Sequence, residues 1–212
     1  MMLDIPFYSN LKDDTHCFQA CLKMLLKHYF PNENSSFKYL DKVTFHKKNK
    51  WTWNSGALLF LSNMGFSVIN IENFDYKQFV EFGEKYLRMI WTDEVFDTQK
   101  QYSDFKQERK LAKKLIKNKS IKLKRRWTNM GEVEDLFKKH YLIMISVNPY
   151  ILKKMNGYAY HLVVITDIDK KYITFHDPGL PSLKNKKVLK TLFLKAMQYP
   201  YKESAALIAV KK

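Results

Sequence analysis

The stretch HLVVITDIDKKYITFHDPG, residues 161–179, contains two apolar runs separated by a polar cluster. Apolar residues in short runs on either side of a polar cluster predict two strands joined by a tight turn. If the pairing is symmetric about Asp169, His161 lies directly opposite Asp177. The stretch therefore predicts an antiparallel hairpin that carries a histidine and a carboxylate at its open end.

The same pairing places Val163 opposite Phe175 and Ile165 opposite Ile173. All of these side chains share one face, because side chains alternate between the two faces of a strand. Opposed Cβ atoms lie about 4.5–5.5 Å apart, which allows an imidazole–carboxylate hydrogen bond at the rim. Such a bond fixes the histidine and leaves its other nitrogen free to take a proton from a nucleophile. A buried histidine that is merely satisfied by a nearby aspartate is the alternative.

The rest of the chain places helices before a run of mostly antiparallel strands, which is typical of the α+β class. Apolar residues that recur every 3.6 residues predict the helices, and apolar residues that alternate with polar ones predict the strands. The predicted helices cover residues 17–30, 54–64, 75–89, 131–140 and 188–198, and the predicted strands outside the hairpin cover residues 3–9, 66–71, 141–148 and 205–210.

The chain has 212 residues, of which 46% are hydrophobic, enough for one sizeable domain or a domain with an insertion. No apolar run approaches the roughly 18 residues of a membrane-spanning helix. The first residues lack the basic and apolar regions of a secretory signal. Two cysteines do not make a disulfide framework, so the sequence predicts a reduced, cytoplasmic setting.

Both cysteines lie in DDTHCFQACLKMLLKHY, residues 13–29, where apolar residues recur at helical spacing. Asp14 or Thr15 is the predicted N-cap. Cys17 then falls in the first turn, where free N–H groups and the helix dipole stabilise a thiolate. Cys21 lies one turn deeper among leucines and is predicted to be a core residue. Cys17 is therefore the candidate nucleophile.

Several segments, taken in order, resemble a known family. IPFYSN and then D-D-x-x-C-x-x-A-C-L-x-M-L-L-K-x-Y come first, followed by GALLFLSNMGFSV, LIMISVN, HLVVITDID and ITFHDPG. Together they resemble the bacteriocin-processing (double-glycine-leader) cysteine peptidase-like family of the papain-like superfamily. The resemblance covers about residues 1–71 and 130–210.

The resemblance implies a single papain-like domain over residues 1–212, with an N-terminal helix packed on a C-terminal antiparallel sheet and a basic helical insertion at about 72–129. It makes the chain a thiol protease or a related amidase or acyltransferase that acts on a peptide or amide bond. Carried over to this sequence, the catalytic residues are Cys17, His161 and Asp177, with Asn10 in the oxyanion hole.

The chain departs from the family's pattern at three positions. Asn10 is a shorter amide than the family's glutamine. Phe18 and Tyr160 replace small glycines beside the nucleophile and the histidine, where they would narrow or block the cleft. Since one lost oxyanion donor costs about 10²–10³ in rate, a weakly active or inactive binding protein is the alternative function.

The region 99–127 has twelve Lys or Arg residues against two acidic residues, and the whole chain carries a net charge of +16. This block predicts an amphipathic basic helix followed by a basic extended piece. It is either a solvated surface or lid, or a contact for nucleic acid, an anionic membrane surface or an acidic protein. The candidate contact residues are Lys106, Arg109, Lys110, Lys113, Lys114, Arg125 and Arg126.

No metal site or cofactor is predicted. His16 faces away from Cys21 and a fourth ligand is missing. His46, which lies beside lysines, is expected to be exposed. Trp51 and Trp53 are expected in the core, with the lining of a substrate groove as the alternative. The chain contains no glycine motif for phosphates or dinucleotides.

Overall fold

The computed structural model describes residues 2–212 and has the α+β architecture that the sequence predicts. The strands are β1 (Ser67–Glu72), β2 (Ile121–Arg125), β3 (Leu142–Val147), β4 (His161–Ile168), β5 (Tyr172–Asp177), β6 (Leu183–Leu189) and β7 (Leu207–Lys211). The helices are α1 (Cys17–Tyr29), α2 (Phe37–Thr44), α3 (Asn54–Asn63), α4 (Tyr76–Phe82), α5 (Glu84–Ile90), α6 (Asp93–Tyr102), α7 (Phe105–Leu115), α8 (Met130–Lys138), α9 (Pro149–Leu152) and α10 (Lys190–Met197), with a 3-10 turn at Lys202–Ser204.

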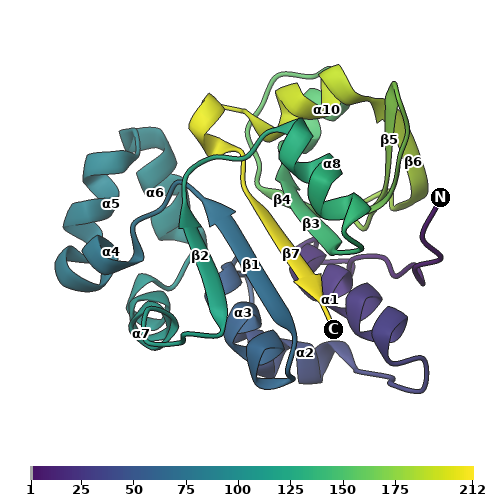
Figure 1. Cartoon of the computed structure of the whole chain (residues 1–212). Coiled ribbons are helices and arrows are strands. Elements are labelled where there is room, and N and C mark those ends of the chain that lie inside the picture. The colour runs from purple at the N-terminus through teal and green to yellow at the C-terminus, as the bar shows by residue number, and fades with distance from the viewer. Residues whose placement is uncertain (1) are drawn as a thin grey trace.

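The strands form one mixed sheet in the order β2-β1-β7-β3-β4-β5-β6 (Figure 1). β1 and β2 are parallel, and the other neighbouring pairs are antiparallel. Helices cover both faces of the sheet, with α1 and α3 on one side and α8 and α10 on the other.

Strand β3, near the middle of the sheet, shows why both faces need helices. Leu142 and Met144 belong to the core beneath α1 and α3. Ile143 and Ile145 belong to the core beneath α8 and α10. A strand that is buried on both faces reads as a continuous apolar run, as LIMISV does.

Helix α1 lies where the sequence predicts it and is held on the sheet by packing and by two side-chain bonds. The Sγ of Cys21 donates to the carbonyl of Leu162 in β4 at 3.3 Å. The hydroxyl of Tyr29 donates to the carbonyl of Val210 in β7 at 3.1 Å. The buried face of α1 fixes the orientation of its first turn, which begins at Cys17.

Residues 72–129, predicted as an insertion, contribute to the same core as α1. Phe79, Phe96 and Phe105 are buried in the cluster that also holds the leucines of α1. The basic extended piece forms β2, which pairs with β1 and completes an edge of the sheet. Removing this region would therefore expose part of the main core.

Several elements differ from the sequence-based expectation. The helix predicted over 75–89 is two helices, because Gly83 adopts a φ of +56° between α4 and α5. Residues 3–9 form no strand in the structure, although the N–H of Leu3 donates to the carbonyl of Thr166. Strand β6 was not predicted, since it is an edge strand with little apolar alternation.

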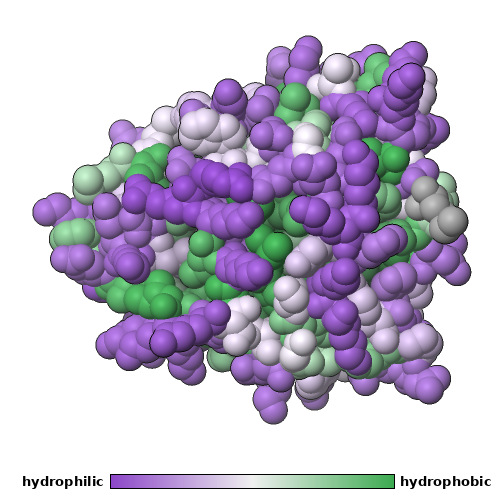
Figure 2. All heavy atoms as spheres, viewed as in Figure 1, coloured by the Kyte–Doolittle hydropathy of each residue, from purple (hydrophilic) through white to green (hydrophobic). Residues whose placement is uncertain are grey.

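Within residues 2–212, none of the helices has the length and apolar character needed to cross a membrane. The face in Figure 2 is mostly hydrophilic, with hydrophobic residues showing between the polar side chains near β1 and β2. This matches the high share of charged residues in the sequence.

Candidate active site

The hairpin of β4 and β5 forms, but its predicted register is wrong. Val164 pairs with His176 and Ile165 with Phe175, which shifts β5 by two residues from the symmetric pairing. A bulge between Ile165 and Asp167 takes up an extra residue near the turn. A shift of two leaves each side chain on its original face.

His161 and Asp177 still meet at the open end of the hairpin. The Nε2 atom of His161 lies 2.7 Å from Oδ1 of Asp177, and both residues are buried. Lys186, on β6, places its Nζ atom 3.0 Å from Oδ2 of the same carboxylate. Burial alone would raise the pKa of Asp177, but the bond from His161 and the charge of Lys186 hold that pKa well below its usual range.

Cys17 also acts on the His161 ring. Burial lowers the pKa of His161, but the bond with Asp177 and the neighbouring Cys17 outweigh it and raise that pKa to about 10. The imidazole is therefore positively charged at neutral pH. An imidazolium between a carboxylate and a thiol can hold a thiolate by charge attraction and later supply a proton.

Gly179 closes over this pair and was not singled out from the sequence. A Cβ atom at this position would lie 3.1 Å from Oδ1 of Asp177 and 3.1 Å from Cε1 of His161. The N–H of Gly179 also donates to Oδ1 of Asp177 at 3.1 Å. The glycine of the DPG segment thus allows the backbone to approach the ring closely.

Cys17 begins α1, but the predicted N-cap is wrong. The N-cap is His16, and no side chain caps the helix. The Asp14 carboxylate instead accepts a bond from Asn10, and the Thr15 hydroxyl bonds to the ring of His16. An uncapped first turn leaves backbone N–H groups free beside Cys17, at the positive end of the helix dipole.

Cys21 lies in the core, as predicted, and Cys17 does not. Cys17 is partly exposed, whereas Cys21 is fully buried, and both are free thiols. Burial raises the pKa of the Cys21 thiol well above its ordinary value. Of the two, only Cys17 combines access with a neighbouring imidazole.

Asn10, the predicted oxyanion residue, is buried and links three parts of the site. Its N–H donates to the carbonyl of Pro178 at 2.8 Å, beside Asp177. Its Oδ1 accepts from the N–H of His16 at 2.8 Å, and its Nδ2 donates to Asp14 at 2.7 Å. These bonds hold the start of α1 against the end of β5. They also use both ends of the Asn10 side-chain amide, the group that was predicted to serve the oxyanion hole.

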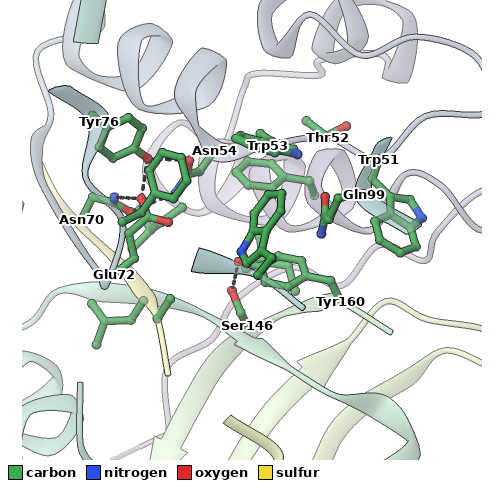
Figure 3. Close-up of a pocket in the computed structure, with 17 residues that line it drawn as sticks. Trp51, Thr52, Trp53, Asn54, Asn70, Glu72, Tyr76, Gln99, Ser146 and Tyr160 are labelled. Atoms are coloured by element: carbon green, nitrogen blue, oxygen red, sulfur yellow. Dashed lines mark hydrogen bonds between the residues drawn. The ribbon is translucent and has the colours of Figure 1, made fainter. Parts of the chain in front are cut away.

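Phe18 and Tyr160, which were expected to narrow the cleft, are the residues next to Cys17 and His161 in sequence, and they line a small pocket of about 120 Å³. This volume lies below the range of most small-ligand sites, about 300–1,000 Å³. The Tyr160 hydroxyl bonds to Ser146 (Figure 3). Trp51 and Trp53 also line the pocket, and Trp53 packs against the core as predicted.

A hydrogen-bonded group around Glu72 lies at one end of this pocket and is not predicted from the sequence. Oε1 of Glu72 accepts bonds from Asn54, Asn70 and Tyr76 (Figure 3). The four residues come from α3, β1 and α4, so no local sequence pattern joins them. The pocket is thus aromatic along one side and holds a fixed carboxylate at its end.

The basic residues divide into two groups. Arg109 donates to the carbonyls of Val80 and Glu81, Arg125 pairs with Asp75, and Arg126 pairs with Glu132. These three arginines are thus engaged by groups within the protein. The exposed lysines of α7 have no ion-pair partner among residues 2–212; they are Lys106, Lys110, Lys113 and Lys114.

Comparisons with known proteins do not assign this chain to a family. No protein-family model matches this chain, and a search of curated proteins finds no significant match.

Proposed function

We propose that this chain is a papain-like cysteine hydrolase or acyltransferase that acts on a peptide or amide bond, as its resemblance to bacteriocin-processing peptidases implies. One observation carries the proposal. His161 bonds to Asp177, the neighbouring Cys17 helps to raise the pKa of His161, and Cys17 begins a helix that has no side-chain cap.

In the proposed reaction, the Cys17 thiolate attacks the substrate carbonyl and forms a C–S bond. Free N–H groups of the first turn of α1 stabilise the oxyanion that develops. His161 gives its proton to the leaving amine as the C–N bond breaks. Water or a second amine then attacks the thioester, His161 takes back a proton, and the acyl group leaves Cys17.

Asp177 holds the imidazole in position throughout and stabilises its charge. Lys186 and the N–H of Gly179 fix the carboxylate in turn. The small aromatic pocket lined by Phe18 and Tyr160, the neighbours of Cys17 and His161 in sequence, would receive a small side chain of the substrate. The chemistry needs no metal at the reacting atoms.

Alkylation by iodoacetamide tests the proposal, with Cys21 as an internal control. Labelling of each cysteine is followed by mass spectrometry at about pH 6, where an ordinary thiol is almost fully protonated. Cys17 is expected to react at least about tenfold faster than free cysteine. His161→Ala is expected to remove this excess, and Cys21 to stay unlabelled.

A rate for Cys17 no higher than that of free cysteine below pH 7 would contradict the proposal. Cleavage is then measured on a mixture of synthetic peptides by mass spectrometry, with Cys17→Ala as the inactive control. Products that appear equally with both proteins would show that the thiol is not the nucleophile.

A second candidate function is a papain-like binding protein without activity. It is favoured by the internal bonds of Asn10 and by the unpaired lysines of α7. Binding to duplex DNA, RNA or anionic vesicles would then fall steeply with salt, because bound phosphates release counterions. No binding at low salt would remove this candidate.

A further inference from the structure

Three side chains next to the start of α1 converge on one point. His16 precedes α1, Asp41 lies in the last turn of α2, and His46 follows α2. One ligand-capable atom of each lies within 4.8 Å of the other two. His46 was expected to be exposed; it is half-buried instead, with its ring centroid 4.3 Å from that of His16.

Two polar atoms in this cluster are buried without a hydrogen-bond partner. They are Oδ1 of Asp41 and Nε2 of His46. Oδ1 of Asp41 lies 3.3 Å from Nε2 of His16, yet the two make no hydrogen bond. Buried polar atoms in proteins are almost always hydrogen-bonded, so the convergence of these two atoms indicates a ligand between them.

The other nitrogen of each imidazole is already engaged. Nδ1 of His16 lies 2.9 Å from Oδ1 of Asp13, and Nδ1 of His46 lies 3.0 Å from the hydroxyl of Thr52. A metal-bound histidine commonly donates its second N–H to a carboxylate or another oxygen, which orients the ring. Both rings therefore present Nε2 to the shared point.

The backbone holds these residues in place. Phe45 adopts the left-handed conformation, with φ 58°, and turns the chain back on α2. The N–H of His46 then donates to the carbonyl of Asp41 at 2.9 Å. On the other side, the N–H of His16 is bonded to Asn10, and His16 is buried.

We propose that His16, Asp41 and His46 bind one Zn²⁺ ion, with a water molecule as the fourth ligand. Ligands about 2.0–2.1 Å from a tetrahedral Zn²⁺ lie about 3.3–3.4 Å apart, which agrees with the 3.3 Å between His16 and Asp41. Two imidazoles and a carboxylate are also a ligand set that Zn²⁺ accepts.

The ion would join the end of α2 to the residue directly before Cys17. Its role is to fix the first turn of α1, so it is a structural site outside the reaction itself. Cys17 supplies no ligand. The zinc site and the proposed function therefore stand or fall separately.

Calorimetric titration of the full chain with ZnCl₂, after treatment with a chelator, tests the site. One ion per chain is expected. In His46→Gln the affinity is expected to fall at least about 100-fold, since a ligand is lost from a three-ligand site. His28→Gln is the matched control, because His28 lies on α1 away from the cluster, and it is expected to bind as the wild type does.

Binding of Co²⁺ provides a second readout on the wild-type protein and on Cys17→Ala. Both are expected to give the visible absorption bands of a four-coordinate Co²⁺ site without a thiolate ligand. No zinc binding by the wild type at micromolar concentration would overturn the proposal, as would equal affinities for His46→Gln and His28→Gln. A spectrum that changes in Cys17→Ala would also contradict the assigned ligands.

Discussion

Two histidine–aspartate arrangements lie at the start of α1 and differ in how their polar atoms are satisfied. At the open end of the hairpin, the Asp177 carboxylate receives bonds from His161, Lys186 and the N–H of Gly179. Beside α2, Oδ1 of Asp41 and Nε2 of His46 have no hydrogen-bond partner.

The difference indicates what each arrangement holds. A satisfied, buried carboxylate stabilises a proton on its histidine, and the pKa of His161 is accordingly raised to about 10, although burial opposes it. In the second arrangement, buried acceptor atoms of Asp41 and His46 converge and no donor satisfies them. Such an arrangement suits a metal cation. The first is therefore suited to proton transfer and the second to a metal ion.

Replacing the carboxylate of the first arrangement gives the largest expected effect. Asp177→Asn keeps the shape but removes the charge that orients and stabilises the imidazolium. In a working triad this change lowers the rate by about 10⁴. The measurement is the cleavage rate on a peptide substrate found in the screen.

Asp169→Asn is the matched control, since Asp169 lies at the turn of the same hairpin and its carboxylate accepts N–H bonds that an asparagine oxygen also accepts. Its rate should equal that of the wild type. A similar loss in both variants would mean that hairpin stability, and not the charge of Asp177, controls the rate.

His161→Gln tests the same arrangement through stability. Leaving Asp177 without its main partner is expected to cost about 1–3 kcal/mol of unfolding free energy near neutral pH. Because folding raises the pKa of His161 from 6.5 to about 10, this stabilisation is complete below pH 6.5 and is lost as the pH rises towards 10. Urea unfolding of both proteins across this range measures it.

A difference between the two proteins that stays constant with pH would contradict a charged His161. The Lys186 ion pair remains in the variant and limits the loss. Cys21→Ala serves as a control, because Cys21 lies on the core side of α1 and should show no such pH dependence up to pH 8.

The sequence predicts the parts of this site that depend on local pattern. The apolar spacing of residues 17–29 sets α1 and places Cys17 at its start and Cys21 in the core. The hairpin was predicted, but its register was wrong because nothing in the sequence identifies the bulge near Asp167. The predicted contact between His161 and Asp177 is still correct, because a register error of two residues, unlike an error of one, keeps each side chain on the same face of the strand.

Other parts depend on distant segments. Lys186 lies on an edge strand whose sequence lacks alternation, and Glu72 gains its partners from α3 and α4. His46 was expected to be exposed because of its lysine neighbours, whereas the left-handed turn at Phe45 directs it towards His16. Such convergence follows from tertiary packing and has no periodic signal in the sequence.

Asp13→Asn tests the second arrangement more gently. Asp13 contacts His16 but lies outside the proposed ligand set. Loss of such a supporting carboxylate typically lowers metal affinity by 10–100-fold, and about tenfold is expected here because Asp13 is exposed to solvent. Zinc titration measures it, with Asp14→Asn as the control; an unchanged affinity would mean that Asp13 does not orient His16.

The smallest effect separates the two arrangements directly. In the presence of a chelator, His46→Gln is expected to cost less than about 1 kcal/mol of unfolding free energy, because only the bond between Nδ1 of His46 and Thr52 is at risk and Nε2 makes no hydrogen bond. With zinc added, the gap between wild type and variant should widen, since an ion bound only to the folded state stabilises it. Urea unfolding with and without zinc measures both values. If His46→Gln costs as much as His161→Gln under chelation, then His46 is held by contacts within the protein, and the contrast between a proton-holding and an ion-holding arrangement fails.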